Sequence, residues 1–478
     1  MHLVKTFASG ALVLLSLLWL AIQQLLLPNE FVRRLFVSPR VGNVDFLQLK
    51  RDWCRVRSKR VAWREMLEPC QEKALFMTDT RYTTNPALSH VSQIIANPAG
   101  EHTRLRIDTY TGHGVLKSFG GDSIRVSFRG PDVVSAAVFD LQNGSYDALA
   151  LLVTPGEYKV EIILDYSQCN GFKDPPSEWY IKAHCSRNKY NATIPPYVSA
   201  NTFDYINKYI SPGLKINITP PRYNIRELQD ITANTDCGFA CKLIWDGHGV
   251  WSKDGKTWQP YVDSLRSSSF KTRRKEKSNN KGLLWIYGDS ISYYFYHRLR
   301  MRRICRKIFN HCKNTYNWIY PKRFYEIRHF CEDVDVSVSK LRQYFREMLN
   351  NEDMNENSVL IFNLGAHFVK NTSFRKYRAI LDALIEELQT YRGKAIWKST
   401  TAIHHQNIEV MGAFRRFLTN QRVLLFNAYA NAAICNAEIQ LLDVNPLSAS
   451  YPAGTKDGVH YHANVSLPME IMLEEFFS

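Results

Sequence analysis

Three kinds of hydrophobic pattern follow one another along the chain. Residues 7–27 form a continuous apolar run, FASGALVLLSLLWLAIQQLLL, which contains no charged residue. From about residue 101 the pattern becomes short alternating runs such as 123–128, which are typical of strands with one buried face. From about residue 281 short apolar runs alternate with segments of helical periodicity. This last pattern predicts an α/β domain with a parallel sheet covered by helices.

The first apolar run is long enough to cross a bilayer, since about 20 apolar residues suffice for a helix. A cleaved signal peptide usually has a shorter apolar region and a cut site flanked by small residues, and we find no convincing site of that kind. We therefore expect residues 1–30 to be a retained signal anchor, a transmembrane helix, with cleavage and secretion as the alternative. Residues 31–100 are basic and lack regular apolar periodicity, which predicts a stem.

The alternating runs lie between residues 101 and 185 and predict an all-β sandwich. Turn-forming dipeptides separate them: Gly120-Gly121, Gly130-Pro131, Asn143-Gly144 and Pro155-Gly156. Residues 186–280 are rich in Asn, Tyr, Pro and Ser, and we expect them to form a connector that wraps the next domain.

Residues 281–478 predict a three-layer α/β/α domain, because strands and helices alternate there. The strands expected from apolar runs are 283–287, 359–363, 395–397 and 423–426. The helices expected are 291–310 and 374–388.

The composition limits which classes of partner and which cellular compartment are plausible for this protein. The chain has 478 residues, 45% of them hydrophobic, which excludes wholesale disorder, and its formal net charge of +16 suits an acidic partner. Ten cysteines and five glycosylation sequons agree with export. We therefore expect a lumenal body in the Golgi or another secretory-pathway membrane, with a glycan, acidic or neutral, as partner and no nucleic acid. The expected glycosylation sites are Asn143, Asn191, Asn217, Asn371 and Asn464.

The even number of cysteines predicts disulfides. We expect two local pairs, Cys54–Cys70 and Cys169–Cys185. The spacing of Cys237 and Cys241 also fits one end of a zinc site, but no second Cys/His pair with finger spacing follows, so no metal is expected.

The tripeptide Gly288-Asp289-Ser290 directly follows one predicted strand and opens a predicted helix. A serine in this position lies at the carboxyl edge of a parallel sheet, where such folds place ligands. The helix N-terminus supplies N–H groups for a developing oxyanion, and Gly288 permits a tight turn. A second copy, residues 121–123, lies in an alternating β run with no helix after it, so we expect a structural turn there.

Asp457 and His460 stand three residues apart near the C-terminus. A serine hydroxyl is a poor nucleophile until a base removes its proton, and a histidine oriented by a carboxylate is such a base. The sequence therefore predicts a catalytic triad of Ser290, Asp457 and His460. The alternative is that Asp457 and His460 only cap a turn.

A third block of polar residues, from Asn363 to His367, follows the strand predicted at 359–363. We expect the Asn363 amide or the Gly365 N–H to donate to the oxyanion. His367 fits a core or loop position better than a substrate contact.

These three blocks together resemble a known family. A strand followed by Gly288-Asp289-Ser290, then the pattern Asn363-x-Gly365-x-His367-Phe, then Asp457-Gly-Val-His460-Tyr near the C-terminus, is similar to the PC-esterase branch of the SGNH/GDSL superfamily. The run FGGDSIRV at 119–126 resembles the immunoglobulin-like half of neurexophilin-type proteins. Over residues 45–478 the chain thus resembles the neurexophilin and PC-esterase domain family.

The resemblance implies a secretory-pathway serine O-acyltransferase or esterase acting on carbohydrate, with O-acetyl as the expected group. Ser290 would be the nucleophile, Asp457 the orienting carboxylate and His460 the base. No bound cofactor is implied, although a transferase would use an acyl donor such as acetyl-CoA. The single anchor, basic stem and sequons resemble a type II Golgi protein. The alternative function is a catalytically inert adhesion or receptor-binding glycoprotein of neurexophilin type.

Three further features each have a structural and a functional interpretation. The cationic run 297–307 fits a solvated helix face better than a glycan site. The aromatic run 293–296 fits core packing of the nucleophile's helix better than stacking on sugar. His404 and His405 fit a structural role better than a polar site lining.

Overall fold

The computed structural model describes residues 45–71, 80–175, 204–223, 235–238, 241–261, 281–316, 337–404 and 417–478. The predicted anchor, the sequon at Asn191 and the cysteines Cys185 and Cys331 lie outside these residues. Within the described ranges no helix combines the length and the apolar character needed to cross a bilayer. Residues 46–478 belong to one unit of continuous contacts, and the description below concerns that unit.

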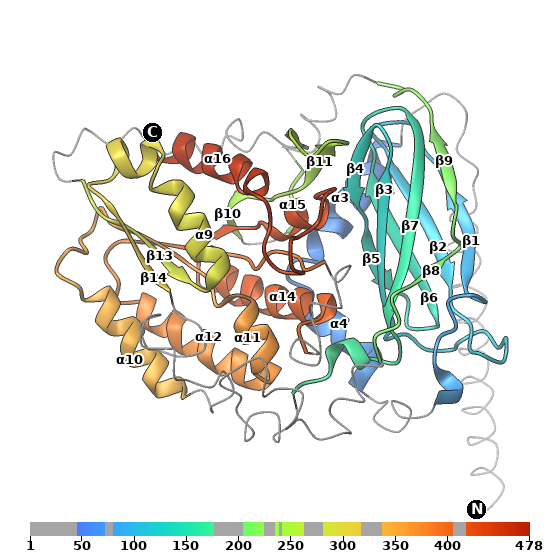
Figure 1. Ribbon diagram of the computed structural model, residues 1–478, viewed down its shortest axis with the longest axis horizontal. Coiled ribbons are helices and arrows are strands. Elements are labelled where there is room, and N and C mark those ends of the chain that lie inside the picture. The colour runs from blue at the N-terminus through green and yellow to red at the C-terminus, as the bar shows by residue number, and fades with distance from the viewer. Residues whose placement is uncertain are drawn as a thin grey trace, which may run out of the picture. The chain divides into compact units, whose positions relative to one another are not determined.

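A six-stranded parallel sheet forms the centre of the C-terminal half (Figure 1). The strand order is β10-β17-β16-β15-β13-β14, so the chain places β14 on one side of β13 and then crosses to the other side for β15. In open α/β sheets, ligands bind at the carboxyl ends of the strands beside such a reversal, which here is the end of β13. The strands are β10 (Lys242–Trp245), β13 (Leu284–Gly288), β14 (Cys312–Tyr316), β15 (Val359–Phe362), β16 (Lys394–Lys398) and β17 (Gln440–Leu442).

Helices cover both faces of this sheet, as the alternating pattern predicted. Successive side chains of a strand point to opposite faces, so each strand contributes to two cores. Trp285 and Phe362 pack among α10, α11, α12 and α14, whereas Ile286 and Ile361 pack among α9, α15 and α16. The helices are α9 (Ser290–Leu299), α10 (Val338–Leu349), α11 (Gly365–Asn371), α12 (Phe374–Leu388), α14 (Asn420–Asn436), α15 (Asn445–Ala449) and α16 (Leu467–Phe477).

In this half, one helix was predicted with its observed bounds because an N-capping residue precedes its apolar pattern. Helix α12 has the predicted bounds, and the Ser373 hydroxyl caps its first turn by accepting from the Lys376 N–H. The strand predicted at 423–426 is wrong, because these residues lie inside α14, whose first turn is capped by Thr419. A short apolar run cannot be told from part of a buried helix by periodicity alone.

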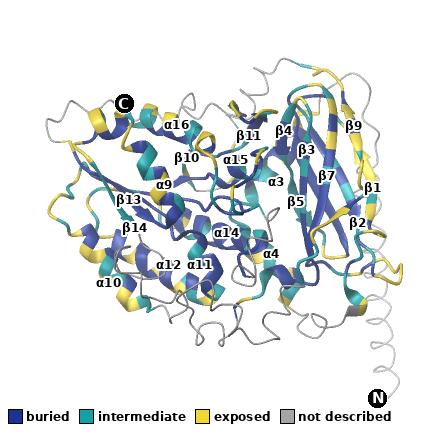
Figure 2. Cartoon of the chain, viewed as in Figure 1, coloured by how far each residue is buried: buried dark blue, intermediate teal, exposed yellow. Residues whose placement is uncertain are grey.

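Two antiparallel sheets share a common core in the N-terminal half, where the alternating runs predicted a β sandwich. One sheet has the order β1-β2-β6-β5, and the other has the order β12-β11-β4-β3-β7-β8, with β9 also paired to β7. Figure 2 shows β3, β6 and β7 largely buried and β1 and β9 exposed at the edges. The strands are β1 (His90–Ile95), β2 (His102–Asp108), β3 (Ser123–Arg129), β4 (Asp132–Ser135), β5 (Ala137–Asp140), β6 (Ser145–Leu151), β7 (Gly156–Tyr166), β8 (Lys208–Ile210), β9 (Lys215–Ile218), β11 (Gly249–Ser252) and β12 (Trp258–Pro260).

The segments expected to be a stem and a connector contain regular elements of both halves. Within the expected stem, α3 (Phe46–Ser58) and α4 (Trp63–Gln71) are helices, and Leu49 and Trp53 of α3 enter the sandwich core. Within the expected connector, β8, β9, β11 and β12 extend the sandwich, while β10 joins the parallel sheet. These elements are short and depend on distant partners, which a local pattern does not reveal.

Both local disulfide pairs predicted above are wrong, because Cys54, Cys70 and Cys169 bond other partners. Cys54 bonds Cys237 and Cys70 bonds Cys169, across 183 and 99 residues. Two further bonds among the described residues are Cys241–Cys435, across 194 residues, and Cys305–Cys312, across 7. Because α3 and α4 lie against the sandwich and not along an extended stem, their cysteines meet partners far along the chain. Both candidate zinc thiols, Cys237 and Cys241, are consumed by disulfides.

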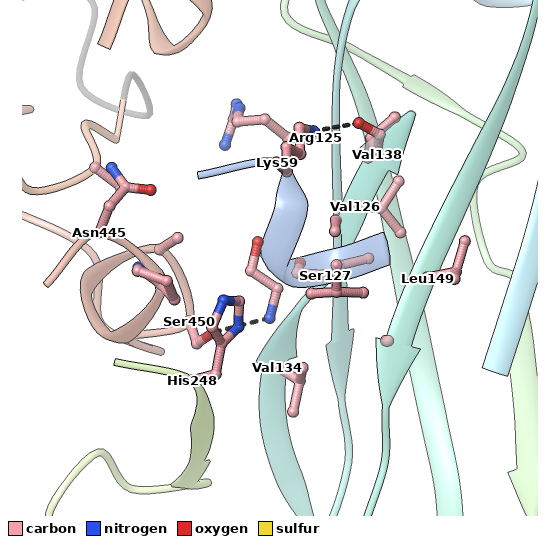
Figure 3. Close-up of a pocket in the computed structure, with 18 of the residues that line it drawn as sticks. Lys59, Arg125, Val126, Ser127, Val134, Val138, Leu149, His248, Asn445 and Ser450 are labelled. Atoms are coloured by element: carbon pink, nitrogen blue, oxygen red, sulfur yellow. Dashed lines mark hydrogen bonds between the residues drawn. The ribbon is translucent and has the colours of Figure 1, made fainter. Parts of the chain in front are cut away.

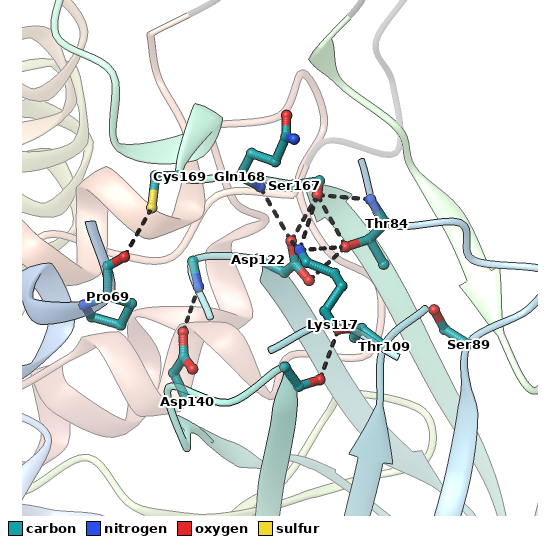
Figure 4. A network of polar contacts seen from close by, with 12 residues as sticks. Pro69, Thr84, Ser89, Thr109, Lys117, Asp122, Asp140, Ser167, Gln168 and Cys169 are labelled. Atoms are coloured by element: carbon teal, nitrogen blue, oxygen red, sulfur yellow. Dashed lines mark hydrogen bonds and ion pairs between the residues drawn. The ribbon is translucent and has the colours of Figure 1, made fainter. Parts of the chain in front are cut away.

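The second Gly-Asp-Ser copy belongs to a buried polar network of the sandwich (Figure 4). The Asp122 carboxylate accepts from Lys117 Nζ at 2.7 Å, from Thr84 Oγ1 at 2.7 Å and from Ser167 Oγ at 2.8 Å. The side chains of Lys117 and Asp122 have no solvent exposure. Ser123 is a buried residue of β3. The copy therefore holds strands together, in agreement with the structural turn expected from its context.

This network leads to a stability prediction. Asp122→Ala leaves the Lys117 ammonium buried without a counter-charge, so the free energy of unfolding should fall by about 3–5 kcal/mol. Glu157→Ala is the matched control, since Glu157 pairs at 2.9 Å with Lys215 on the exposed surface of the same sandwich and should cost about 1 kcal/mol or less. Urea titrations of both variants measure the difference. Equal losses would contradict the structural role assigned to Asp122.

Candidate active site

Ser290 occupies the first position of α9, directly after β13. Asp289 caps the helix, with Oδ1 accepting from the Ile291 N–H at 3.0 Å and Oδ2 accepting from the Ala366 N–H at 2.7 Å. A side chain at position 288 would meet Ser292, because a Cβ there would lie 2.3 Å from Ser292 Oγ. The glycine and the aspartate together give the sharp strand-to-helix turn that presents Ser290 at the sheet edge.

The structure brings Ser290, His460 and Asp457 into one chain of hydrogen bonds. Ser290 Oγ lies 2.8 Å from His460 Nε2, and His460 Nδ1 lies 2.8 Å from Asp457 Oδ2. With Nδ1–H donating to the carboxylate, Nε2 is the atom that accepts the serine proton. Ser290 is separated from His460 by 170 residues, so the contact depends on the complete domain.

Asp457 both caps its own turn and orients His460, so the two interpretations of this pair are not exclusive. Its Oδ1 accepts from the N–H groups of Val459 at 3.1 Å and His460 at 2.8 Å. Burial raises the pKa of Asp457, but the hydrogen bonds from His460 and Val459 outweigh it and hold the pKa well below its ordinary value. The carboxylate is therefore charged across the working pH range.

The aromatic run on α9 packs against the core only in part, and its exposed part borders the triad. Phe295 is buried in the core and Tyr296 packs against it, whereas Tyr294 is 57% exposed and Tyr293 is also exposed. The Tyr294 ring meets His460 edge-on, with centroids 5.4 Å apart. Residues four apart share a helix face, so Tyr294 stands beside Ser290 at the mouth of the site. Four consecutive residues of a helix point in different directions around its axis. They therefore cannot all pack against the same core.

Two arginines of the cationic run that follows form ion pairs with α16. Arg298 donates to Glu470 at 2.5 Å, and Arg302 donates to Glu474 at 2.9 Å. These pairs fasten the nucleophile's helix to the C-terminal helix. The run therefore supports the site structurally, and its two engaged arginines are not free to bind a glycan.

The third block differs from the prediction in the role of Asn363. Its Nδ2 donates to the Lys398 carbonyl at 2.7 Å and to Thr400 Oγ1 at 3.1 Å, which uses both amide hydrogens. The Asn363 amide is therefore not an oxyanion donor in this structure. It instead ties the end of β15 to the segment after β16. His367 lies half-buried in the first turn of α11.

Gly365 packs its backbone against the nucleophile turn. Its φ of +70° is favoured by glycine, and a Cβ there would lie 2.0 Å from Asp289 Oδ2. The N–H groups of Gly365 and Ser290 make no hydrogen bond to another residue in the described part of the chain. Both groups flank Asp289, and no glycine separates Asp289 from Leu364 in the sequence. They are the candidate oxyanion donors.

Lys398 is a site neighbour that sequence analysis missed. It ends β16, it is 1% exposed, and its carbonyl holds the Asn363 amide. Burial lowers the pKa of Lys398 to about 8, opposed by the charge of Asp289. The sequence did contain a feature that could have identified Lys398 as a site neighbour. This lysine directly follows an apolar strand run, at the carboxyl edge of the parallel sheet.

His404 supports the loop that carries Asp457 and His460, in line with the structural role expected for it. Its N–H donates to the Gly458 carbonyl at 3.0 Å, and its Nε2 lies 3.3 Å from the Ser448 carbonyl. Its ring meets Tyr461 edge-on, with centroids 5.6 Å apart. Burial lowers the pKa of His404 to about 4. His405 lies outside the described residues.

The sequons differ in access. Asn143, Asn217 and Asn464 are exposed, whereas Asn371 is 1% exposed at the end of α11. A glycan must leave the amide nitrogen into solvent, so the predicted glycosylation of Asn371 is wrong. The packing of α11 buries Asn371, and the three residues of the sequon do not reveal this packing.

Comparison with known proteins leaves the family of this chain unassigned. No family model matches the chain. No curated protein matches its sequence. Among solved structures, similarity is found to a protein from Bacteroides fragilis assigned as an acylhydrolase, with 16% identity, a TM-score of 0.31, and coverage of 44% of this chain and 92% of that one.

Two further solved structures give similar values. A GDSL-like lipase from Bacteroides thetaiotaomicron has 15% identity and a TM-score of 0.30, covering 41% of this chain and 87% of that one. A carbohydrate acetylesterase from Sinorhizobium meliloti has 12% identity and a TM-score of 0.29, covering 41% and 98%. TM-scores of this size do not place the chain in a family.

The position of Gly365 leads to a kinetic prediction. Gly365→Ala should lower kcat by about 100-fold or more, because the added methyl group would collide with the Asp289 carboxylate and displace the backbone N–H that is a candidate oxyanion donor. Gly213→Ala is the matched control, since Gly213 also has a positive φ, of +85°, but no atom within 4 Å of its added Cβ. Steady-state hydrolysis of a soluble acetate ester measures both. A loss of the same size in the control would rule out a specific role.

The burial of His404 leads to a pH prediction. Its pKa falls from 6.5 to about 4 on folding, so its contribution to stability is complete above pH 6.5 and is lost as pH falls toward 4. The loss for this one group should reach roughly 2 kcal/mol between pH 6.5 and 5. His404→Gln cannot titrate and should flatten the profile of melting temperature against pH over this range. An unchanged slope in the variant would contradict the burial of a neutral His404.

Proposed function

We propose that this protein is a serine esterase or O-acyltransferase of SGNH type that acts on acylated carbohydrate, with acetyl as the expected group. The observation that carries the proposal is the continuous chain from Ser290 Oγ through His460 to Asp457, with both contacts at 2.8 Å. This chain stands at the carboxyl edge of the parallel sheet, next to free N–H groups of a helix start. The arrangement matches the chemical needs of acyl transfer through a serine.

The first half of the reaction forms an acyl-enzyme. Ser290 Oγ attacks the acyl carbonyl carbon while His460 Nε2 takes the hydroxyl proton. The N–H groups of Ser290 and Gly365 donate to the carbonyl oxygen as it becomes negative. As the tetrahedral intermediate collapses, His460 returns the proton to the leaving alkoxide or thiolate. Asp457 remains ionised and stabilises the imidazolium.

The second half decides between esterase and transferase. His460 takes a proton from water or from a sugar hydroxyl, and the resulting nucleophile attacks the carbonyl carbon of the Ser290 ester. The bond between Ser290 Oγ and the acyl carbon then breaks, and His460 returns the proton to Ser290 Oγ. Water gives a free carboxylic acid, whereas a sugar hydroxyl gives a new sugar ester. A transferase would use an acyl donor such as acetyl-CoA as its first substrate.

Two features support carbohydrate as the substrate class. The exposed ring of Tyr294 borders His460, and the exposed ring of Tyr293 lies next to Tyr294. A tyrosine ring offers an apolar face to a sugar with its hydroxyl in water. The family resemblance stated above points to the same class. The four disulfides of the described residues suit an oxidising compartment, and with the anchor expected at 1–30 we propose a lumenal site of action in the Golgi or another secretory membrane.

Mutational coupling tests this proposal. Ser290→Ala and His460→Ala should each lower turnover of an O-acetylated sugar by about 1,000-fold or more, and the double variant should be no worse than either, because the two residues act as one unit. Ser123→Ala, in the second Gly-Asp-Ser copy, should leave turnover intact. Labelling by a serine-reactive fluorophosphonate should follow the same pattern.

Two outcomes would contradict the proposal. Losses that multiply in the double variant would show that Ser290 and His460 act independently. A wild-type chain that neither turns over a broad panel of esters nor reacts with the probe would favour the inert adhesion protein instead.

A further inference from the structure

The segment that leads from α15 to the loop of Asp457 and His460 packs against the β sandwich. Trp251 of β11 is 0% exposed, and its Nε1–H donates to the Leu447 carbonyl at 2.9 Å. Leu447 belongs to α15, whose last carbonyls have no partner within the helix, so this bond satisfies one of them. The Trp251 ring also meets the Tyr451 ring edge-on, with centroids 5.0 Å apart. A sandwich side chain therefore enters a hydrophobic core of the parallel-sheet half.

Two further contacts tie the same segment to β3 and β4. The N–H of Ser135, at the end of β4, donates to Ser450 Oγ at 3.0 Å. Arg129, at the end of β3, donates from Nη1 to the Pro452 carbonyl at 3.0 Å. Ser135 and Ser450 line a cavity of about 210 Å³ at this junction, and Figure 3 shows Ser450 beside β4. Three strands of the sandwich, β3, β4 and β11, therefore hold residues 450–452.

A row of aromatic rings continues from this segment to the proposed base. The loop that carries the base is closed by a β-bridge between Thr455 and Tyr461. The Tyr461 ring meets the Tyr451 ring edge-on, with centroids 6.1 Å apart, which is within the range of favourable aromatic pairs. The rings of Trp251, Tyr451 and Tyr461 thus connect the sandwich to the residue next to His460.

The proposed nucleophile is held by other contacts. Asp289 caps α9, and Arg298 of α9 donates to Glu470 of α16 at 2.5 Å. These contacts place Ser290 from within the parallel-sheet half, whereas the chain leading to His460 is held by the sandwich. A shift of that chain would therefore move His460 Nε2 away from Ser290 Oγ and leave α9 in place.

We propose that Trp251 is a positioning residue, through which the β sandwich sets the distance between His460 and Ser290. This inference rests on the acyl-transfer function proposed for these two residues. Removal of the indole would leave the Leu447 carbonyl without its donor and the Tyr451 ring without its partner. Because a misplacement of about 1 Å can cost about 100-fold in rate, a small shift of the loop is sufficient. The sandwich then belongs to the catalytic unit and is not only a separate binding module.

Steady-state hydrolysis of a soluble acetate ester tests the role of Trp251. Trp251→Leu should lower kcat by about 100-fold and change KM by less than about threefold, because it displaces the base and not the surface that binds the substrate. Trp251→Phe keeps a ring beside Tyr451 and should recover most of the loss. Phe128→Leu is the matched control, since Phe128 is also fully buried but lies in the inner core of the sandwich, and it should keep the wild-type kcat.

Hydrogen exchange followed by mass spectrometry reports on the loop without any substrate. In the full-length Trp251→Leu chain, peptides that cover residues 455–461 should exchange at least about tenfold faster than in the wild type, whereas peptides that cover residues 290–299 should not change. This measurement separates the two proposals. A wild-type chain without turnover would refute the proposed function, and the exchange result would still decide whether Trp251 holds the loop.

Three results would overturn the positioning role. The first is an unchanged kcat in a folded Trp251→Leu chain of a protein whose wild type is active. The second is unchanged exchange of residues 455–461 in that variant. The third is an equal loss of kcat in Phe128→Leu, which would show that any damage to the sandwich has the same effect. The melting temperature of each variant reports whether it folds.

Arg129→Met provides a second test if Trp251→Leu does not fold. It removes the donor to the Pro452 carbonyl, and Glu161 keeps Lys159 at 3.0 Å as its partner, so no carboxylate is left without a counter-charge. The variant should lower kcat and raise the exchange rate of residues 455–461. A folded Arg129→Met chain with unchanged exchange in this loop would overturn the proposal.

Discussion

The Asp289 carboxylate is the interaction on which the candidate site depends. One oxygen caps α9 through the Ile291 N–H, and the other holds the Ala366 N–H at the start of α11. A single buried side chain thus joins the turn after β13 to the turn after β15. This places Ser290 and the backbone of Gly365 next to each other. A side chain at position 365 would occupy the place of the carboxylate, so the glycine and the aspartate require each other.

The sandwich and the parallel-sheet half are joined by more than surface contact. Helix α3 inserts Trp53 into the sandwich core, while a disulfide links the same helix to the segment before β10. A second disulfide joins the residue before β10 to Cys435 of α14. The elements that precede and follow the sandwich in sequence therefore fasten it to the parallel-sheet half.

The parts of the candidate site that sequence could predict are those that depend on short spacing. Ser290 follows an apolar strand run and opens a helix, and Asp457 stands one turn from His460, so their side chains could be expected to face a common edge. The role of Asn363 could not be predicted. Whether its amide points toward the substrate or toward Thr400 depends on where β16 ends, which is set by the sheet register. The exposure of Tyr294 likewise depends on which face of α9 covers the sheet.

By itself the sequence determined the β sandwich, the α/β half with its parallel sheet and the three residues proposed as a triad, because alternation, helical periodicity and cap or turn residues act over a few positions. The tertiary structure decided which cysteines pair, whether 423–426 is strand or helix, that Asn371 is buried, and that residues 46–71 pack as helices. Apart from the local pair Cys305–Cys312, each of these depends on contacts between segments that are distant in the chain. A short segment does not determine its partner, because the free energy that selects the pairing comes from burying both surfaces together.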